Sequence, residues 1–289
     1  MNPRNLLNLV LAFVVLGLGA AVWLSQREES PATPERITTL TEADVTRIEI
    51  HSARHADAVL ERRGTEWWLV EPFMARADRA KIDAAFGLLR ARSLARYPAA
   101  AVTANQAGLD EPDLRLRADD TELVLGGTEA LGGRRYVGIG GSVHLIVDRY
   151  SHLLRGGPAS LVSPRLLPTG ARLREIRLPG LHLLQGDGQW QLAGGGTASS
   201  DALRALVDEW RHARALRVSR GDADAVGEVV TLSPQGDAPP LRFVLQRGDG
   251  EILLTRGDLG LSYHFTPDVA ARLLALPSVD NEGDGDGNA

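Results

Sequence analysis

Apolar and polar positions repeat in one order along this chain, first over residues 44–154 and again over residues 173–274. Each copy begins with a short alternating segment, at 47–50 and at 175–178, which is typical of a half-buried strand. A glycine turn then leads to Trp-x-Leu, and a stripe of apolar residues at helical spacing follows. The repetition predicts two copies of one fold unit.

Matched positions run through both copies. The final segment places His144 and Asp148 of the first copy in the positions of His264 and Asp268 in the second. The Trp-x-Leu segments each have a leucine on the same strand face as the tryptophan, so we interpret both tryptophans as core residues beneath a helix. These segments are Gly64, Trp67 and Leu69 in the first copy, and Gly188, Trp190 and Leu192 in the second.

Strands and helices of the two copies are expected in the same order. Short connections between consecutive strands predict antiparallel pairing, with one helix on a face of each sheet. The first copy is expected to have strands over 47–50, 58–62, 66–70, 114–117, 122–125, 135–139 and 143–147, and helices over 78–95 and 148–154. The second is expected to have a helix from Ser200 or Asp201 and later strands over 228–232, 241–245, 251–255 and 262–266.

The N-terminal segment 6–24 is apolar except for Asn8 and carries no charge. A helix of that length rises about 28 Å, close to the thickness of bilayer hydrocarbon. Arg4 precedes the segment and Trp23 lies where an interfacial aromatic residue is expected. The pattern predicts a single-pass inner-membrane anchor, with the N-terminus in the cytoplasm and the bulk of the chain in the periplasm.

A cleaved signal peptide is the alternative for this segment. Its apolar region is ordinarily about 7–15 residues long and ends in a small-x-small cleavage site. Here the small residues 19–21 are followed by the bulky residues 22–24 inside the apolar run. An uncleaved anchor is therefore the prediction.

The predicted fold class is α+β: an N-terminal transmembrane helix followed by two similar antiparallel-sheet-plus-helix repeats. Glycine and proline enrichment between the copies indicates a linker. The predicted division is a cytoplasmic N-terminus at 1–5, the anchor at 6–24, a spacer at 25–43, repeat 1 at 44–155, a linker at 156–171, repeat 2 at 172–276 and a disordered acidic tail at 277–289.

Composition narrows the function classes. The chain of 289 residues is 44% hydrophobic, as expected for a folded protein, and has a net charge of −5. Four carboxylates lie in the tail, at 280, 282, 284 and 286, so the rest of the chain is close to neutral and we expect no nucleic-acid partner. There is no cysteine, which excludes disulfides and thiol catalysis.

The candidate catalytic and metal-binding patterns are weak. His51 and His55 are spaced as metal ligands on a helix would be, but they flank a strand end and a loop. His144 and His264 recur in both copies, which favours a structural role. The glycine pairs between 126 and 141 lack the lysine of a phosphate-binding loop, and no Gly-x-Ser-x-Gly elbow is present. We therefore predict no enzyme, no catalytic residues, no metal and no cofactor.

A partner-binding surface is the remaining candidate site. Trp68 lies on the strand face opposite to Trp67 and has Gln191 as its counterpart, so it is free to contact a partner. Arg90, Arg92 and Arg96 cluster at the C-terminal half of the expected helix, where solvation beside the negative helix end is the ordinary interpretation. The predicted partner surface is Trp68 with these three arginines.

Several motifs resemble a known family. They are Trp-Trp-Leu-Val-Glu-Pro at 67–72, Ala-Asp at 77–78, Ala-Gly-Leu-Asp-Glu-Pro at 107–112 and the run from 136 to 148. Together with the N-terminal anchor, they resemble the bacterial domain of unknown function 4340 family over most of residues 44–154. The second copy is similar more loosely and lacks the Gly-Leu-Asp-x-Pro segment. The resemblance implies an envelope role beside gliding-motility-type ABC transporter components and supplies no catalytic residues.

The predicted function is a non-enzymatic, membrane-anchored periplasmic scaffold or partner-binding module, accessory to an ABC-type transport or envelope system. Its expected partners are the inner membrane and another envelope protein, with the ligand unknown. The alternative is a periplasmic glycan- or peptide-binding protein that uses a groove between the repeats. A hydrolase is a third, weaker alternative.

Overall fold

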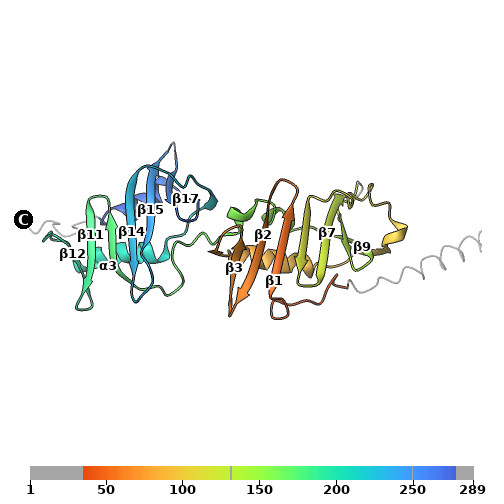
Figure 1. Cartoon of the computed structure of the whole chain (residues 1–289), viewed down its shortest axis with the longest axis horizontal. Coiled ribbons are helices and arrows are strands. Elements are labelled where there is room, and N and C mark those ends of the chain that lie inside the picture. The colour runs from red at the N-terminus through yellow and green to blue at the C-terminus, as the bar shows by residue number, and fades with distance from the viewer. Residues whose placement is uncertain (1–34, 131, 249, 278–289) are drawn as a thin grey trace, which may run out of the picture.

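The chain forms two antiparallel sheets that lie one after the other along the long axis of the molecule (Figure 1). The computed structural model describes residues 35–130, 132–248 and 250–277. It is mostly β, with 41% strand and 17% helix. We call the part built around the first sheet unit 1 and the part built around the second sheet unit 2.

The sheet of unit 1 has nine strands in the order β4-β3-β2-β1-β6-β7-β8-β9-β5. Most neighbours are consecutive hairpins, as the short connections require. The strands are β1 Arg47–Ser52, β2 His55–Arg63, β3 Glu66–Glu71, β4 Ala75–Arg76, β5 Ala95–Pro98, β6 Leu114–Ala118, β7 Thr121–Thr128, β8 Arg135–Ile139 and β9 Ser142–Ile146. The helices of this unit are α2 Arg79–Leu89 and the 3₁₀ turns η1 Ala99–Ala101 and η2 Ser151–Leu153.

The sheet of unit 2 has eight strands in the order β12-β11-β10-β14-β15-β16-β17-β13. Its strands are β10 Leu173–Leu178, β11 Leu181–Gly186, β12 Gln189–Leu192, β13 Arg217–Arg220, β14 Glu228–Pro234, β15 Leu241–Arg247, β16 Ile252–Arg256 and β17 Leu261–Phe265. Its helices are α3 Ser200–His212 and α4 Pro267–Leu274. Apart from the additional β4, the two sheets have the same strand order.

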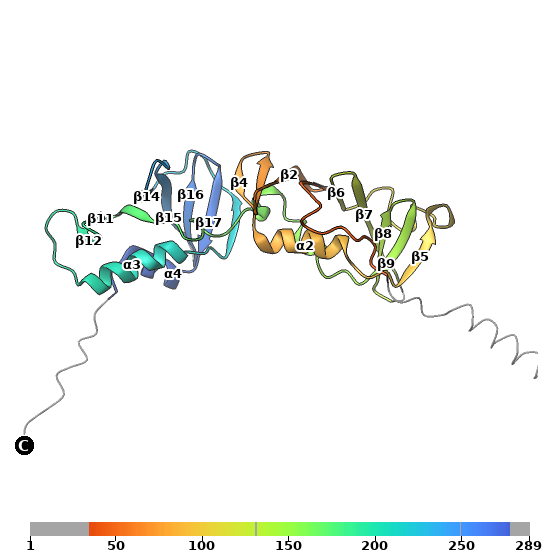
Figure 2. The same cartoon turned by 90° about the horizontal axis from the view of Figure 1, so that it is seen from below.

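One long helix covers a face of each sheet, α2 in unit 1 and α3 in unit 2 (Figure 2). Asp78 caps α2 by accepting a hydrogen bond from the backbone N–H of Ala80. On α2, Phe86 packs against Trp67 with 6.1 Å between the ring centroids. On α3, Trp210 is fully buried and its indole N–H donates to the carbonyl of Leu273 at 2.8 Å. Each helix thus covers the apolar face of its sheet and completes the hydrophobic core of its unit.

The segment between the units, residues 154–172, is called the connecting segment and is packed against both of them. It contains the 3₁₀ turn η3 Pro158–Leu161, and Leu161, Val162, Leu166 and Leu167 are buried. Toward unit 1, the N–H of Ser163 donates to the carbonyl of Arg76 at 2.8 Å. Toward unit 2, the N–H of Ala215 donates to the carbonyl of Pro164 at 2.9 Å. The buried residues of both units and of this segment form one continuous hydrophobic cluster.

The predicted α+β class is wrong, because the chain is mostly β. The difference lies where the sequence predicts helix or loop. The helix expected over 78–95 ends at Leu89, and residues 95–98 instead form β5, which pairs with β9. Residues 217–220 likewise form β13 against β17. Each of these strands pairs with a strand that is distant from it in the chain, and local periodicity does not reveal such a partner.

The predicted localisation is also corrected. Within the described residues, no helix is long and apolar enough to cross a membrane. The segment predicted as an N-terminal transmembrane helix, residues 6–24, lies outside the described residues. The single-pass inner-membrane placement with the bulk in the periplasm is contradicted by this finding.

Candidate functional site

A groove of about 640 Å³ lies where unit 1, the connecting segment and unit 2 meet. Unit 1 contributes residues of β3 and β4, and unit 2 contributes the ends of β14 and β16, the start of β15 and Tyr263 in the middle of β17. The connecting segment forms its base. The lining residues are Trp68, Met74, Ala75, Arg76, Val162, Ser163, Arg165, Leu166, Leu167, Pro168, Ala171, Arg172, Pro234, Gln235, Ala238, Pro239, Leu241, Arg256, Leu259 and Tyr263.

The floor of the groove is apolar. Leu166 and Leu167 are buried beneath it, while Met74 at its rim is 51% exposed. Trp68 is half-buried and reaches the groove because it lies on the strand face opposite to buried Trp67. Its cross-strand partner is Arg76, another lining residue. An indole and a guanidinium therefore stand side by side at the unit 1 wall.

The charged residues that line the groove are all basic. Four arginines line it and no lining residue is acidic, among the residues that the structure describes. Arg76 pairs with Glu66 at 2.6 Å, and Arg256 pairs with Asp258 at 2.5 Å. Arg165 and Arg172 are exposed and have no ion pair within the described residues. Two guanidinium groups at the groove are thus free to bind a carboxylate or another anion.

The residues of the partner surface that the sequence predicts lie at two separate places in the structure. Trp68 is in the groove, but the three arginines lie toward the far edge of the unit 1 sheet, across which β3 and β5 are separated by six other strands. Arg90 caps the end of α2, Arg92 forms an isolated bridge with Arg36, and the Nε of Arg96 donates to Ser142 at 3.1 Å. These arginines do not form one site with Trp68.

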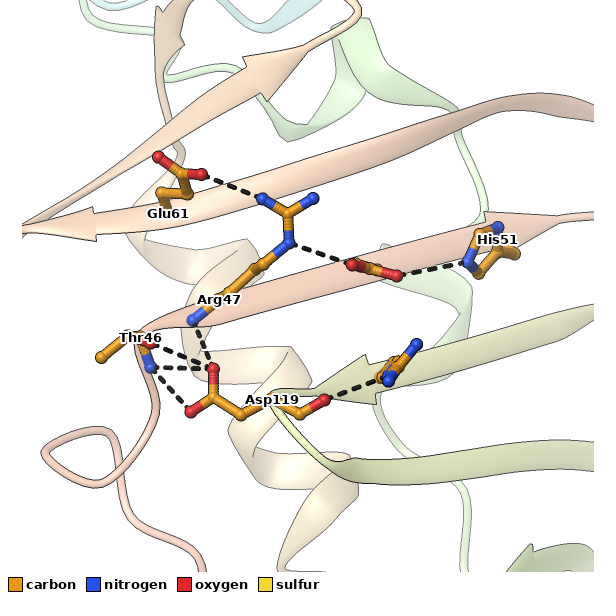
Figure 3. Close-up of polar contacts among 7 residues, drawn as sticks. Thr46, Arg47, His51, Glu61 and Asp119 are labelled. Carbon is orange, nitrogen blue, oxygen red and sulfur yellow. Dashed lines mark hydrogen bonds and ion pairs between the residues drawn. The ribbon is translucent and has the colours of Figure 1, made fainter.

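A polar network covers part of the unit 1 sheet away from the groove (Figure 3). Arg47 pairs with Glu49 and with Glu61, each at 2.9 Å, and the hydrogen bond from Arg47 lowers the pKa of Glu49. Asp119 accepts from the backbone N–H groups of Thr46 and Arg47, so it ties the start of β1 to the β6–β7 turn. The charged groups of this network pair with one another or with backbone N–H groups, and the network is best explained as stabilisation across neighbouring strands.

His51 joins this network and does not form a metal site with His55. Its Nδ1 is 2.9 Å from a carboxylate oxygen of Asp57. No cluster of three or more potential metal ligands occurs among the described residues.

The two matched histidines are buried in different polar surroundings. His144 Nδ1 is 2.8 Å from the hydroxyl of Ser93, and burial, together with Arg96, lowers the pKa of this histidine. His264 has the hydroxyl of Ser219 2.8 Å from Nε2 and a carboxylate oxygen of Glu251 2.8 Å from Nδ1. Sequence reasoning missed Ser219 and Glu251, because strand pairing brings them together from positions 45 and 13 residues from the histidine.

Comparisons with protein-family models, with curated proteins and with solved structures each find no match. The resemblance to the domain of unknown function 4340 family therefore stays a prediction that rests on the motifs themselves.

Proposed function

We propose that this protein is a partner-binding module that holds an extended, apolar and acidic segment of another protein in the groove between its two units. The observation that carries this proposal is the apolar floor bordered by arginines with no lining carboxylate.

The two kinds of lining residue supply different parts of the binding. Apolar side chains of the partner segment lose water against the leucines and Trp68, at about 25 cal/mol for each Å² of apolar surface buried. Carboxylates of the segment pair with Arg165 and Arg172, whose planar guanidinium groups can donate two parallel hydrogen bonds to one carboxylate. Binding therefore requires both properties in one ligand.

The lining favours a peptide over a glycan. A glycan requires many hydrogen-bonding side chains, whereas the uncharged polar side chains here are those of Ser163, Gln235 and Tyr263. The volume lies within the roughly 300–1,000 Å³ of ordinary ligand sites, which suits a few residues of an extended segment.

Selection from a random displayed-peptide library on the full-length protein tests the proposal. We expect the enriched peptides to combine apolar residues with Asp or Glu, and their affinity to fall as ionic strength rises. Fluorescence polarisation of a labelled peptide should show binding weakened at least about tenfold by Arg165→Glu with Arg172→Glu, equivalent to about 1.4 kcal/mol. Trp68→Ala should weaken binding in the same direction.

Two control variants make the test specific. Arg204→Glu changes an exposed arginine of α3 outside the groove and should leave binding unchanged. Arg90→Glu with Arg92→Glu tests the surface that the sequence predicts. Peptides that lose binding only in this last variant would overturn the groove as the site.

A further inference from the structure

A continuous hydrogen-bonded chain of serine, histidine and carboxylate lies at one edge of the unit 2 sheet. Ser219 is on β13, the last strand of the sheet, and His264 is on its neighbour β17. Glu251 comes immediately before β16, on the other side of β17. The imidazole of His264 thus has a hydroxyl at Nε2 and a carboxylate at Nδ1, each at 2.8 Å.

Strand register accounts for this placement. Arg217 lies directly opposite His264, so Ser219, two residues further, projects on the same sheet face. Leu253 lies directly opposite His264, so Glu251, two residues before Leu253, projects on the same sheet face as the histidine. The three side chains meet although each comes from a different segment of the chain.

The arrangement is specific to unit 2. The pairing of β5 with β9 places Pro98 where β13 has Ser219, and the pairing of β8 with β9 places Arg135 where unit 2 has Glu251. The recurrence of histidine in both units can be explained by packing, because both are buried. Packing does not account for a hydroxyl and a carboxylate that are aligned on opposite ring nitrogens in only one unit.

We propose that Ser219, His264 and Glu251 form a serine-nucleophile site that hydrolyses small carboxylic esters. Ser219 is the nucleophile, His264 Nε2 takes its proton, and Glu251 holds the ring through Nδ1, the roles that this geometry performs in serine hydrolases. The hydrogen bond from His264 lowers the pKa of Glu251, so the carboxylate remains ionised at neutral pH. Arg217 also pairs with Glu251 at 2.9 Å and fixes its position.

The reaction balances with water as the co-reactant. The Oγ of Ser219 attacks the ester carbonyl carbon and its proton passes to His264, which returns it to the departing alkoxide as the carbon–oxygen bond breaks. Water then attacks the acyl-serine, gives a proton to His264 and restores Ser219, so one ester and one water yield one acid and one alcohol. The hydroxyl of Ser219 also lies 3.2 Å from the carbonyl of Arg220, and attack requires its proton to point to His264 instead.

The edge of the sheet supplies further groups to the substrate. Gly221 donates its N–H to Gly260 across the ladder at 2.9 Å, so by alternation the N–H of Arg220 points away from β17 and toward the open edge. That N–H is a donor for the developing oxyanion on the residue after the nucleophile. Leu216 is 67% exposed, and its backbone N–H donates to the carbonyl of His264 at 2.8 Å. The class of substrate is therefore a short-chain ester that binds at an open edge.

The test uses the full-length protein with a fluorophosphonate probe and with p-nitrophenyl acetate. We expect the probe to label Ser219, identified by mass spectrometry of the labelled peptide, and Ser219→Ala to abolish labelling. His264→Gln and Glu251→Gln should lower the esterase rate at least about 100-fold. Ser93→Ala is the matched control, because it removes the serine beside His144 and should leave rate and labelling unchanged.

Two results would overturn the site. One is no probe adduct on Ser219 of the wild-type protein, which decides the question even if Ser219→Ala does not fold. The other is equal esterase rates for the wild type and folded Ser219→Ala, with folding checked by circular dichroism. Peptide binding in the groove is independent of these outcomes, since Ser219 and Glu251 do not line it.

Discussion

Four tryptophans lie in the described part of the chain. Their burial distinguishes side chains of the hydrophobic core from those exposed enough to contact a partner. Trp210 is 0% exposed and Trp67 is 4% exposed, and the indole N–H of each has an acceptor, Leu273 for Trp210 and Glu42 for Trp67. The repeat predicts Trp190 as the core equivalent of Trp67, but Trp190 is only half-buried because β12 is the edge strand of its sheet. The same register position therefore has a different environment in each unit.

Alanine substitutions should rank the tryptophans by burial. Loss of a fully buried tryptophan commonly costs about 3–5 kcal/mol, so Trp210→Ala and Trp67→Ala should each lower the free energy of unfolding by about that much. Trp190→Ala and Trp68→Ala should each cost clearly less. Urea unfolding of the four variants checks the order, and a larger loss for Trp190→Ala than for Trp67→Ala would contradict it.

His144 should make stability depend on pH. Burial, and to a lesser extent Arg96, lowers its pKa from 6.5 in the folded protein, and Glu35 opposes the shift. As pH falls below 6.5, the unfolded chain takes up a proton at this position before the folded chain does, so the free energy of unfolding decreases.

His144→Gln keeps a polar side chain beside Ser93 but removes the group that titrates. Between pH 8 and pH 5.5, on either side of the ordinary histidine pKa of about 6.5, the variant should lose less stability than the wild type. Equal losses in urea unfolding would contradict this.

At the scale of elements, the connecting segment depends on a glycine. Gly157 precedes η3 with φ 76° and ψ 176°, a region that only glycine adopts readily. A Cβ at this position would also lie 2.9 Å from the ring of His55 on β2. The segment thus passes close to unit 1 because no side chain separates them.

Gly157→Ala should lower the free energy of unfolding by about 1–3 kcal/mol through backbone strain, with a further loss from the contact with His55. Gly170→Ala is the matched control, since Gly170 has the same φ of 76° but nothing within 4 Å of an added Cβ. The melting temperature should therefore fall further in Gly157→Ala than in Gly170→Ala. Equal falls would show that the approach to His55 is not restrictive.

At the scale of the whole molecule, the two units are joined by a packed segment and share one hydrophobic cluster. Val162, Leu166 and Leu167 of that segment are buried, and Leu166 donates its N–H to Ala213 of unit 2 at 3.3 Å. This packing gives the groove a fixed base and sets the distance between its walls. A binding site built from both units needs that constraint.

Hydrogen exchange followed by mass spectrometry should show this packing directly. Peptides covering 158–167 should exchange slowly, at rates close to those of the sheet strands, because the segment is packed between the units and the N–H groups of Ser163 and Leu166 are bonded to unit 1 and unit 2 respectively. Leu166→Ala with Leu167→Ala should speed exchange there and weaken peptide binding in the groove. Exchange of 158–167 within seconds in the wild-type protein would show a free tether instead.

The sequence by itself located most strands, the repetition of the pattern and the helix that follows each Trp-x-Leu segment, because these depend on local periodicity and on turn residues. Trp67 is buried and Trp68 half-buried as the alternation predicts. Sequence alone overestimated the length of the first helix and missed β5 and β13, whose only partners are strands more than 40 residues away.

Only the tertiary structure decided which side chains share a site. The groove joins β3, the connecting segment and unit 2, and the chain of Ser219, His264 and Glu251 depends on the register of three strands. Such contacts follow from the order of strands in a sheet, which hydrophobic periodicity along the chain does not specify.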